Sequence, residues 1–353
     1  MVLSREAIEL KKTKKVNSYT LILIAFTLAI ILFFTIAKGK AFWRGDVWAG
    51  MLVQFPEYGC IALGMMFCFI SDYLDLSCIM LSNLANILMI KFLTATVVEG
   101  MSNSEIGRLL VIGILIAFGI SLAGALVNSF LVTYMNIPPV MATVSTQMVW
   151  LGISTALTKG DTVTGLPSLY TTIGHMKFFG WLPLTVLVFA GCFLITGFIL
   201  NYTVYGKRLF MLGSNQKAVA YSGINHYVVI SVCMILCAFM STVGGLIMTS
   251  TLSSAKADYG TSYIMRCFLI LMLAGVDAGK GKMINVLITT FTIQIIATGV
   301  NLFSNFNTYV ASVIWGGMLL IVLVLTTYMT DDGFSFPFVE KLKKKKLAKA
   351  AEQ

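Results

Sequence analysis

Tyr19-Thr-Leu-Ile-Leu-Ile-Ala-Phe-Thr-Leu-Ala-Ile-Ile-Leu-Phe-Phe-Thr-Ile-Ala37 is a run of 19 residues without a charged side chain. A helix needs about 20 mostly apolar residues to cross the hydrocarbon core of a bilayer, so this run predicts a membrane-spanning helix. The run is longer than the apolar core of a typical signal peptide, and no small-residue cleavage site accompanies it. We therefore expect it to be retained as an anchor.

The rest of the chain repeats this pattern. Apolar residues make up 58% of its 353 residues and charged residues 11%, whereas soluble domains are about one quarter charged. This composition excludes a soluble enzyme, a disordered protein and a disulfide-stapled secreted domain. It predicts an all-α, polytopic membrane protein with about ten transmembrane helices, some of them short or broken. The expected spans are 19–37, 57–71, 76–98, 108–134, 138–158, 181–203, 225–249, 260–276, 283–300 and 308–329.

Much of the net charge of +10 comes from basic residues at the two ends of the chain, including Lys11, Lys12, Lys14, Lys15 and Lys343–Lys346. Basic tails beside apolar spans mark the cytoplasmic side of a membrane, and ten spans return both ends to that side. We expect a cytoplasmic N-terminus over 1–18, a transmembrane domain over 19–329 and a cytoplasmic tail over 330–353. Because there is no basic domain, nucleic-acid binding is not expected.

Two of the expected spans are unusual. The stretch 57–71 is short, and 260–276 contains Arg266 and ends in a run of glycines. Short or broken apolar segments in corresponding halves of a chain are typical of discontinuous helices at a transport path. The alternative is two ordinary short helices that end in turns.

The residues that a membrane enzyme needs are missing. The two histidines lie outside any HExxH pattern, and no GxSxG sequence occurs. The segment from Gly275 to Lys282 resembles a phosphate-binding loop, but its spacing is one residue short and Gly281 replaces the Ser or Thr that binds magnesium. We predict no catalytic residue, no metal site and no cofactor, with any ATP bound by a partner subunit. The seven cysteines are interpreted as packing residues.

Polar side chains within the spans are mostly uncharged. The ionisable residues noted in or beside spans are Asp72, Asp75, Lys91 and Arg266, and for Lys91 a structural role is favoured. The shortage of membrane acids argues against a proton relay. Hydroxyl and amide groups can bind a neutral polar solute or join helices. The residues predicted to line a path are Asp75, Ser77, Asn83, Asn128 and Thr143.

The central loop over about 204–224 is the most informative segment. Gly206 and Gly213 are expected to bracket a short extended piece, and Ser214 or Asn215 can cap a helix over 216–222 that Gly223 ends. Such a helix on the cytoplasmic side offers a surface to a partner protein.

This loop resembles the permease subunits of bacterial ABC importers of the ribose, galactose, xylose and autoinducer-2 type. The family's pattern is Thr-x-x-Gly-(Arg/Lys)…Gly-x-Asn-x-x-Ala-Ala-x-x-Ser-Gly-Ile. Over 203–224 the residues that fit it are Thr203, Gly206, Lys207 or Arg208, Gly213, Asn215, Ala218 or Ala220, Ser222, Gly223 and Ile224. Gly64–Ser77 resembles the family's Gly-Met…Asp-Leu-Ser segment, and 124–143 resembles a further segment, so the likeness covers roughly 55–328. The resemblance implies that the loop docks on the ATPase through Gly206, Arg208, Gly213, Asn215, Ala218, Ser222 and Gly223, and that Asp75 and Ser77 lie near the path.

The resemblance further implies the partners and the location. We expect a multi-pass protein of the bacterial inner membrane, not itself an enzyme, that translocates a sugar or sugar-like solute by alternating access. Its partners would be a cytoplasmic ABC ATPase, a second permease chain, an extracytoplasmic solute-binding protein and the lipid bilayer.

The sequence departs from the family at two places. Asp72 and Tyr73 replace paired glycines, and Arg266 stands where relatives carry acidic residues nearby. These departures leave the solute open and make one half of a heteromeric permease pair plausible, with a homodimer as the alternative. The alternatives are a nucleoside or branched-chain amino-acid importer, or an ion-coupled secondary transporter.

Overall fold

The computed structural model describes residues 2–98, 100–178, 180 and 182–303, with side chains from residue 19 onward, and seven residues between 313 and 322. The predicted span 308–329 lies largely outside these residues. The helices are α1 (Val2–Lys38), η1 (Gly39–Ala41), α2 (Gly45–Ser71), α3 (Cys78–Thr96), α4 (Asn103–Thr133), α5 (Pro139–Thr158), α6 (Ser168–His175), α7 (Leu184–Tyr202), α8 (Val204–Ser214), α9 (Gln216–Tyr221), α10 (His226–Leu252), α11 (Thr261–Leu273) and α12 (Met283–Asn301).

Membrane-spanning helices dominate the described chain. Eight helices (α1 from Tyr19, α2, α3, α4, α5, α7, α10 and α12) are long and apolar enough to cross a bilayer, and α11 is apolar but has only 13 residues. Extended structure among the described residues is confined to the two-stranded hairpin β1 (Lys177–Phe178) and β2 (Leu182–Pro183), which pairs Lys177 with Pro183, and to isolated bridges. The all-α polytopic prediction is confirmed, and the expected span 260–276 corresponds to the shorter helix α11.

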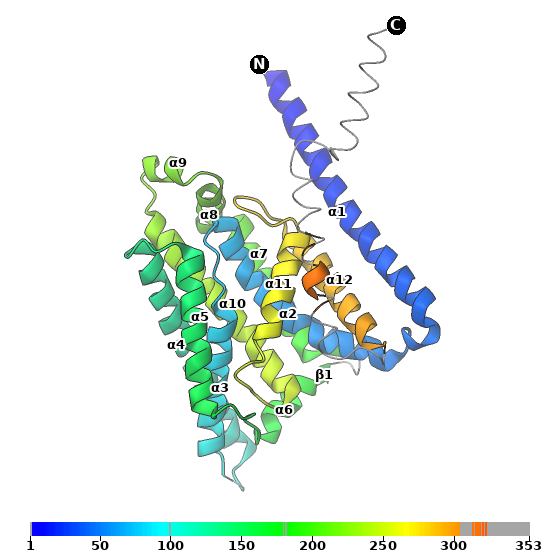
Figure 1. The fold of residues 1–353 in the computed structure, drawn as a ribbon, viewed down its shortest axis with the longest axis vertical. Coiled ribbons are helices and arrows are strands. Elements are labelled where there is room, and N and C mark those ends of the chain that lie inside the picture. The colour runs from blue at the N-terminus through cyan, green and yellow to red at the C-terminus, as the bar shows by residue number, and fades with distance from the viewer. Residues whose placement is uncertain are drawn as a thin grey trace. The chain divides into compact units, whose positions relative to one another are not determined.

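Helix α2 is the centre of the bundle. Every residue from Phe55 to Ser71 is buried, and the helix packs against α7, α8, α10, α11 and α12. A helix that is covered on all sides must belong to the interior, because it has no face left for lipid. Helix α1 is the opposite case, since it lies at the periphery (Figure 1) and packs mainly on α12.

The predicted start of the second span at residue 57 is wrong. Helix α2 begins at Gly45 and continues through Pro56 for 27 residues. The first turns carry Asp46, Gln54 and Glu57, and these polar residues interrupt the apolar pattern that marks a span in the sequence. Proline inside a membrane helix is tolerated because neighbouring helices and local adjustments satisfy the freed backbone groups.

Small residues let the central helices approach one another closely. A β-carbon built on Gly64 would lie 2.7 Å from the Cys237 carbonyl oxygen, and one on Gly124 would lie 2.3 Å from the Leu81 side chain. On α10, a β-carbon on Gly245 would lie 2.3 Å from Asn86 Nδ2. Close backbone approach gives helices in lipid the dispersion contacts that apolar burial cannot supply there.

The connections gather at two opposite ends of the bundle. Figure 1 shows α8, α9 and the N-terminal end of α1 at one end, called here the α8 end, and α6 with β1 at the other, the α6 end. At the α8 end, the Tyr19 hydroxyl donates to the Leu273 carbonyl at 2.8 Å. At the α6 end, Val163 and Ala255 exchange backbone hydrogen bonds of 2.8 and 3.0 Å.

Helix α2 ends in a left-handed turn at Asp72. This residue has φ of +64°, and its N–H reaches the Phe69 carbonyl at 3.2 Å while the Tyr73 N–H reaches the Cys68 carbonyl at 3.2 Å. These two bonds form a Schellman motif, whose left-handed position is usually glycine. Aspartate therefore occupies a left-handed position here that glycine usually fills.

We predict that Asp72→Gly is more stable than Asp72→Ala by about 1 kcal/mol, because the β-carbon of alanine disfavours the left-handed conformation whereas glycine adopts it freely. The comparison is made on thermal unfolding midpoints of the purified variants. Asp161 is an exposed residue without a positive φ. There, Asp161→Ala should be more stable than Asp161→Gly. A lower midpoint for Asp72→Gly than for Asp72→Ala would contradict the prediction.

Candidate functional site

The connection between α2 and α3 brings together four of the five residues predicted to line a path. Asp75 Oδ1 accepts hydrogen bonds from the backbone N–H and the hydroxyl of Ser77, both at 2.8 Å. Asn128 Nδ2 on α4 donates to Ser77 Oγ at 2.6 Å, and the Thr143 hydroxyl on α5 donates to the Leu74 carbonyl at 3.3 Å. The sequence places these polar groups far apart, and the packing of α4 and α5 on α3 joins them.

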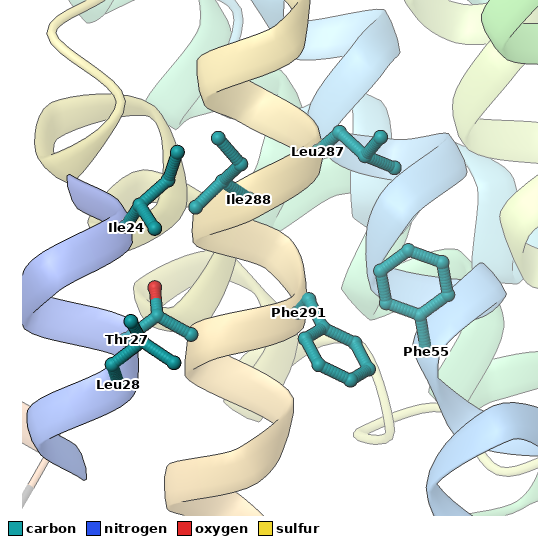
Figure 2. A pocket seen from close by; sticks show the side chains of 7 residues that line it. All are labelled: Ile24, Thr27, Leu28, Phe55, Leu287, Ile288 and Phe291. Carbon is teal, nitrogen blue, oxygen red and sulfur yellow. The ribbon is translucent and has the colours of Figure 1, made fainter. Parts of the chain in front are cut away.

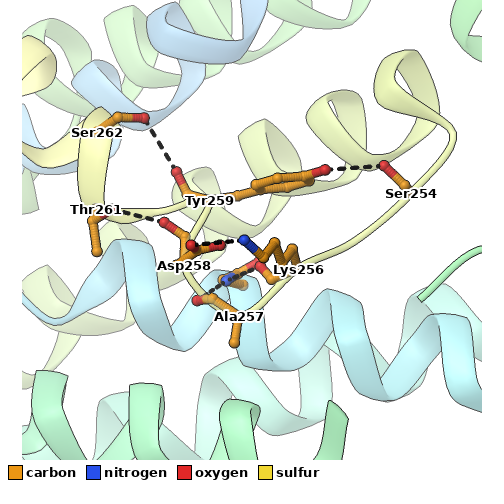
Figure 3. A network of polar contacts seen from close by, with 8 residues as sticks. Ser254, Lys256, Ala257, Asp258, Tyr259, Thr261 and Ser262 are labelled. Carbon is orange, nitrogen blue, oxygen red and sulfur yellow. Dashed lines mark hydrogen bonds and ion pairs between the residues drawn. The ribbon is translucent and has the colours of Figure 1, made fainter. Parts of the chain in front are cut away.

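The fifth predicted residue, Asn83, lies elsewhere. Its Nδ2 donates to the Lys256 and Ala257 carbonyls at 2.9 and 2.7 Å, which ties α3 to the α10–α11 connection at the α6 end. Figure 3 shows this connection, which also contains an ion pair between Lys256 and Asp258 at 3.0 Å and a contact between the Tyr259 and Ser254 hydroxyls at 3.3 Å.

Four buried oxygen acceptors on three segments lack a donor. Asp75 Oδ2 lies in the α2–α3 connection, Asn83 Oδ1 and Asn86 Oδ1 lie on α3, and Asn128 Oδ1 lies on α4. None of the four accepts a hydrogen bond from a described residue. Buried polar groups are normally paired, so a series of open acceptors requires an explanation. Their chemical complement is a molecule that carries several O–H or N–H donors.

A second polar cluster joins α2, α10 and α11 nearer the α6 end. Glu57 is 3% exposed. Its Oε1 accepts from the Thr251 hydroxyl at 2.6 Å and its Oε2 accepts from the Tyr263 hydroxyl at 2.8 Å. Because both carboxyl oxygens are bonded, this cluster holds the three helices together.

Arg266 completes this cluster. Its guanidinium lies 5.2 Å from the centre of the Tyr58 ring and donates to the Tyr58 hydroxyl. The Tyr58 and Tyr263 rings stack with centroids 4.6 Å apart. Arg266 stood out in the sequence, but Glu57, at the first residue of the span as it was predicted, was missed. A carboxylate directly after a proline at the start of an apolar run was the one available signal, and its partners could not be read from the sequence.

The α8 end carries the predicted coupling loop. Thr203 caps α8 by accepting from the Gly206 N–H at 3.2 Å, and Asn215 Oδ1 caps α9 by accepting from the Ala218 N–H at 3.1 Å. Gly223 ends this segment with φ of +71°. The caps at Asn215 and Gly223 confirm the predicted short helix.

The extended piece predicted between Gly206 and Gly213 is wrong, because α8 is helical from Val204 to Ser214. These glycines let the backbone of α8 lie close to neighbouring backbone atoms. A β-carbon on Gly206 would lie 2.3 Å from the Leu200 carbonyl oxygen, and one on Gly213 would lie 1.8 Å from the Ile70 carbonyl oxygen.

Gly213 belongs to a joint of three segments, which we call the α2–α8 joint (Ile70, Gly213 and Gly279). The Gly279 N–H donates to the Ile70 carbonyl at 2.8 Å, and a β-carbon on Gly213 would lie 2.5 Å from the Gly279 nitrogen. Helix α8 therefore contacts both the end of α2 and the turn that precedes α12 through backbone atoms.

The outer surface of α8 and α9 is polar and exposed. The exposed residues include Lys207, Arg208, Asn215, Lys217, Ala218, Tyr221, Ser222 and Gly223. Tyr221 is 92% exposed. Near the start of this surface, partial burial and the charge of Asp277 raise the pKa of the Asp72 carboxyl.

The remaining reactive residues have structural surroundings. All seven cysteines are buried and free, and Cys233 Sγ lies 3.7 Å from Cys68 Sγ between α10 and α2. Lys91 donates to the Leu157 carbonyl and so joins α3 to α5. Within the described part of the chain, no three His, Cys, Asp or Glu residues are grouped to hold a metal ion.

Known proteins resemble this chain over most of its length. The family model for the permease component of branched-chain amino acid transport systems matches residues 47–323. The ribose import permease protein of Bacillus subtilis is 29% identical over 279 residues, 78% of this chain and 83% of that protein. The L-arabinose transport system permease protein of Escherichia coli is 24% identical, over 79% and 82% of the two chains.

A third relative is the autoinducer 2 import system permease protein of Yersinia enterocolitica, which is 22% identical over 56% of this chain and 62% of that protein. No solved structure matches the chain.

We predict that Tyr263→Phe lowers the thermal unfolding midpoint, because removing the hydroxyl leaves a buried Glu57 oxygen without its donor at a cost of about 1–3 kcal/mol. Tyr259→Phe is the matched control, since the Tyr259 hydroxyl is only part-buried and contacts Ser254 at 3.3 Å. Equal midpoints for the two variants would contradict the assignment of Glu57 as a tie between helices.

Proposed function

The chain belongs to the family of permease components of branched-chain amino acid transport systems, and we propose that it is the transmembrane subunit of an ATP-binding cassette importer for a polyhydroxylated solute. It is a multi-pass membrane protein with a transport role. In the proposed complex, ATP is hydrolysed by a separate cytoplasmic subunit, a solute-binding protein delivers the cargo outside, and a second permease chain completes the path.

The observation that carries the proposal is the presence of four buried open acceptors, Asp75 in the α2–α3 connection, Asn83 and Asn86 on α3 and Asn128 on α4. A sugar presents several hydroxyl donors, which are the groups these oxygens require. Two of the relatives are named for the sugars ribose and L-arabinose. The same residues are buried here, so solute would reach them when α3 separates from α4 or α10.

A branched-chain amino acid is the second candidate, because the family description names that cargo. The buried Glu57 and the neighbouring Arg266 are the opposite charges that a zwitterion would need. Both Glu57 oxygens already accept hydrogen bonds from Thr251 and Tyr263, so we favour the polyhydroxylated solute.

The proposed coupling runs through α8 and α9. The exposed surface of these helices would contact the ATPase, and the α2–α8 joint would pass its movement to the end of α2, close to Asp75. This assignment places the α8 end in the cytoplasm, together with the basic tails. Binding of ATP by the partner would bias inward and outward states only through contacts that differ between them.

We predict that Asn86→Ala lowers solute uptake at least tenfold while the ATPase still co-purifies, because the change removes a path acceptor and leaves the α8 end intact. Uptake of labelled ribose and arabinose by cells that carry the complete transporter is the measurement. The exposed Asn103 supplies the control, Asn103→Ala. If Asn86→Ala takes up every sugar transported by the unmodified protein at the normal rate, Asn86 does not line the path.

We predict that Asn215→Ala reduces ATPase co-purification and uptake together, because loss of the cap weakens α9 by about 1 kcal/mol. Asn225→Ala is the matched control, since Asn225 caps α10 at the same end by accepting from the Val228 N–H at 3.4 Å. Gly213→Val should have a larger effect than Asn215→Ala, because its side chain collides with the α2–α8 joint. Unchanged assembly and uptake in both loop variants would refute the coupling assignment.

A further inference from the structure

Helices α7 and α12 both pack against α2, and a groove remains between them at the α8 end. Its inner part has a volume of about 280 Å³ and includes Met66 of α2 and Phe210 of α8 in its lining. Its outer part has a volume of about 580 Å³. The two parts share Asn201, Met283 and Ile284, so they are adjacent, and we call them together the α7–α12 groove.

The lining of this groove changes from apolar to positively charged along its length. Phe193, Leu194 and Phe198 line the portion farther from the α8 end, and Leu194 and Phe198 are 70% and 62% exposed. Lys282 and Asn201 line the portion at that end. The ion pairs found among the described residues are Arg44 with Asp46 and Lys256 with Asp258, so the Lys282 charge has no carboxylate partner there.

We propose that the α7–α12 groove binds an anionic glycerophospholipid of the inner leaflet. The acyl chains would lie along Phe193, Leu194 and Phe198, and the phosphate would contact Lys282. The inner-leaflet location rests on the orientation given under the proposed function. Basic pockets between transmembrane helices on the cytoplasmic side are typical sites for acidic lipid headgroups.

The dimensions of the groove favour a lipid over other anions. Phe193 precedes Asn201 by eight residues of one helix, which is about 12 Å of rise into the membrane. A free phosphate would leave this apolar part unused, and a soluble protein partner would not reach it. Because Phe210 belongs to α8, the bound lipid would contact the helix that we propose as the coupling element.

A second groove, which is almost entirely apolar, provides a comparison for the role of the Lys282 charge. It lies between α1 and α12, beside α2, has a volume of about 360 Å³ and is lined by Ile24, Thr27, Leu28, Phe55, Leu287, Ile288 and Phe291. Figure 2 shows these side chains, and Thr27 carries the one polar side chain among them. Its hydroxyl already bonds to Leu23 and Thr292. This groove can accept acyl chains, but it has no group that selects a headgroup.

The test is native mass spectrometry of the purified full chain titrated with phosphatidylglycerol or phosphatidylcholine. We expect preferential retention of phosphatidylglycerol, and about fivefold weaker retention in Lys282→Gln, the factor that corresponds to one lysine–anion contact near a membrane. Lys280→Gln is the matched control, because Lys280 is exposed, lies two residues away and lines neither part of the groove.

A second variant tests the apolar part. A β-carbon on Gly197 would lie 3.1 Å from the Met283 sulfur, so Gly197→Leu should fill the groove and reduce retention of both lipids. Equal retention of the two lipids by the unmodified chain, or equal phosphatidylglycerol retention by Lys282→Gln and Lys280→Gln, would overturn the proposal. Displacement of the lipid by added ATPase subunit would assign the groove to that protein instead. The assay involves no transport, so its failure is distinct from failure of the proposed function.

Discussion

The hydrogen bond from the Gly279 N–H to the Ile70 carbonyl, together with the close approach of Gly213, fixes the relation between α8, the end of α2 and the start of α12. Any side chain at residue 213 would meet backbone atoms, which cannot rotate away as a flexible side chain can. Contacts of this kind transmit displacement instead of absorbing it, because packed interiors deform little. The loop on the surface and the buried centre of the bundle are therefore mechanically joined.

The interior of the bundle satisfies two opposing requirements. In lipid, unpaired polar groups are costly, and Glu57, Ser77 and Lys91 accordingly find partners on neighbouring helices. A transport path instead needs groups that remain available to a solute. The open oxygens of Asp75, Asn83, Asn86 and Asn128 meet this second requirement, and Asp75, three residues after the Asp72 turn, connects them to the α2–α8 joint.

The all-α polytopic architecture follows from composition and hydropathy alone, because a bilayer demands long apolar helices. Ten spans were expected, and eight helices among the described residues are long and apolar enough to cross a bilayer. The caps at Asn215 and Gly223 were also predictable, since capping depends on neighbouring residues. The errors arose where tertiary contacts decide the outcome. The first turns of α2 were missed because Asp46, Gln54 and Glu57 interrupt the apolar pattern. Gly206 and Gly213 were expected to bracket an extended piece, although both lie within α8 and serve close packing.

The candidate site was predictable only in part. Asp75, Ser77, Asn128 and Thr143 lie together, but a linear sequence does not reveal that Asn83 points to a different connection. Glu57 escaped notice because its partners, Thr251 and Tyr263, lie 194 and 206 residues away along the chain. Residues paired over such separations become recognisable only when the fold is known.

The most direct test of the account is site-specific photocrosslinking from residue 221, where a benzoyl-phenylalanine replaces the 92% exposed Tyr221 in the assembled transporter. We predict a crosslink to the ATPase subunit whose yield changes between the ATP-bound and nucleotide-free states. The same probe at Met176, an exposed residue near the α6 end, should give no crosslink to that subunit. Absence of the crosslink at residue 221 in both nucleotide states of a complex that still imports solute would contradict the account.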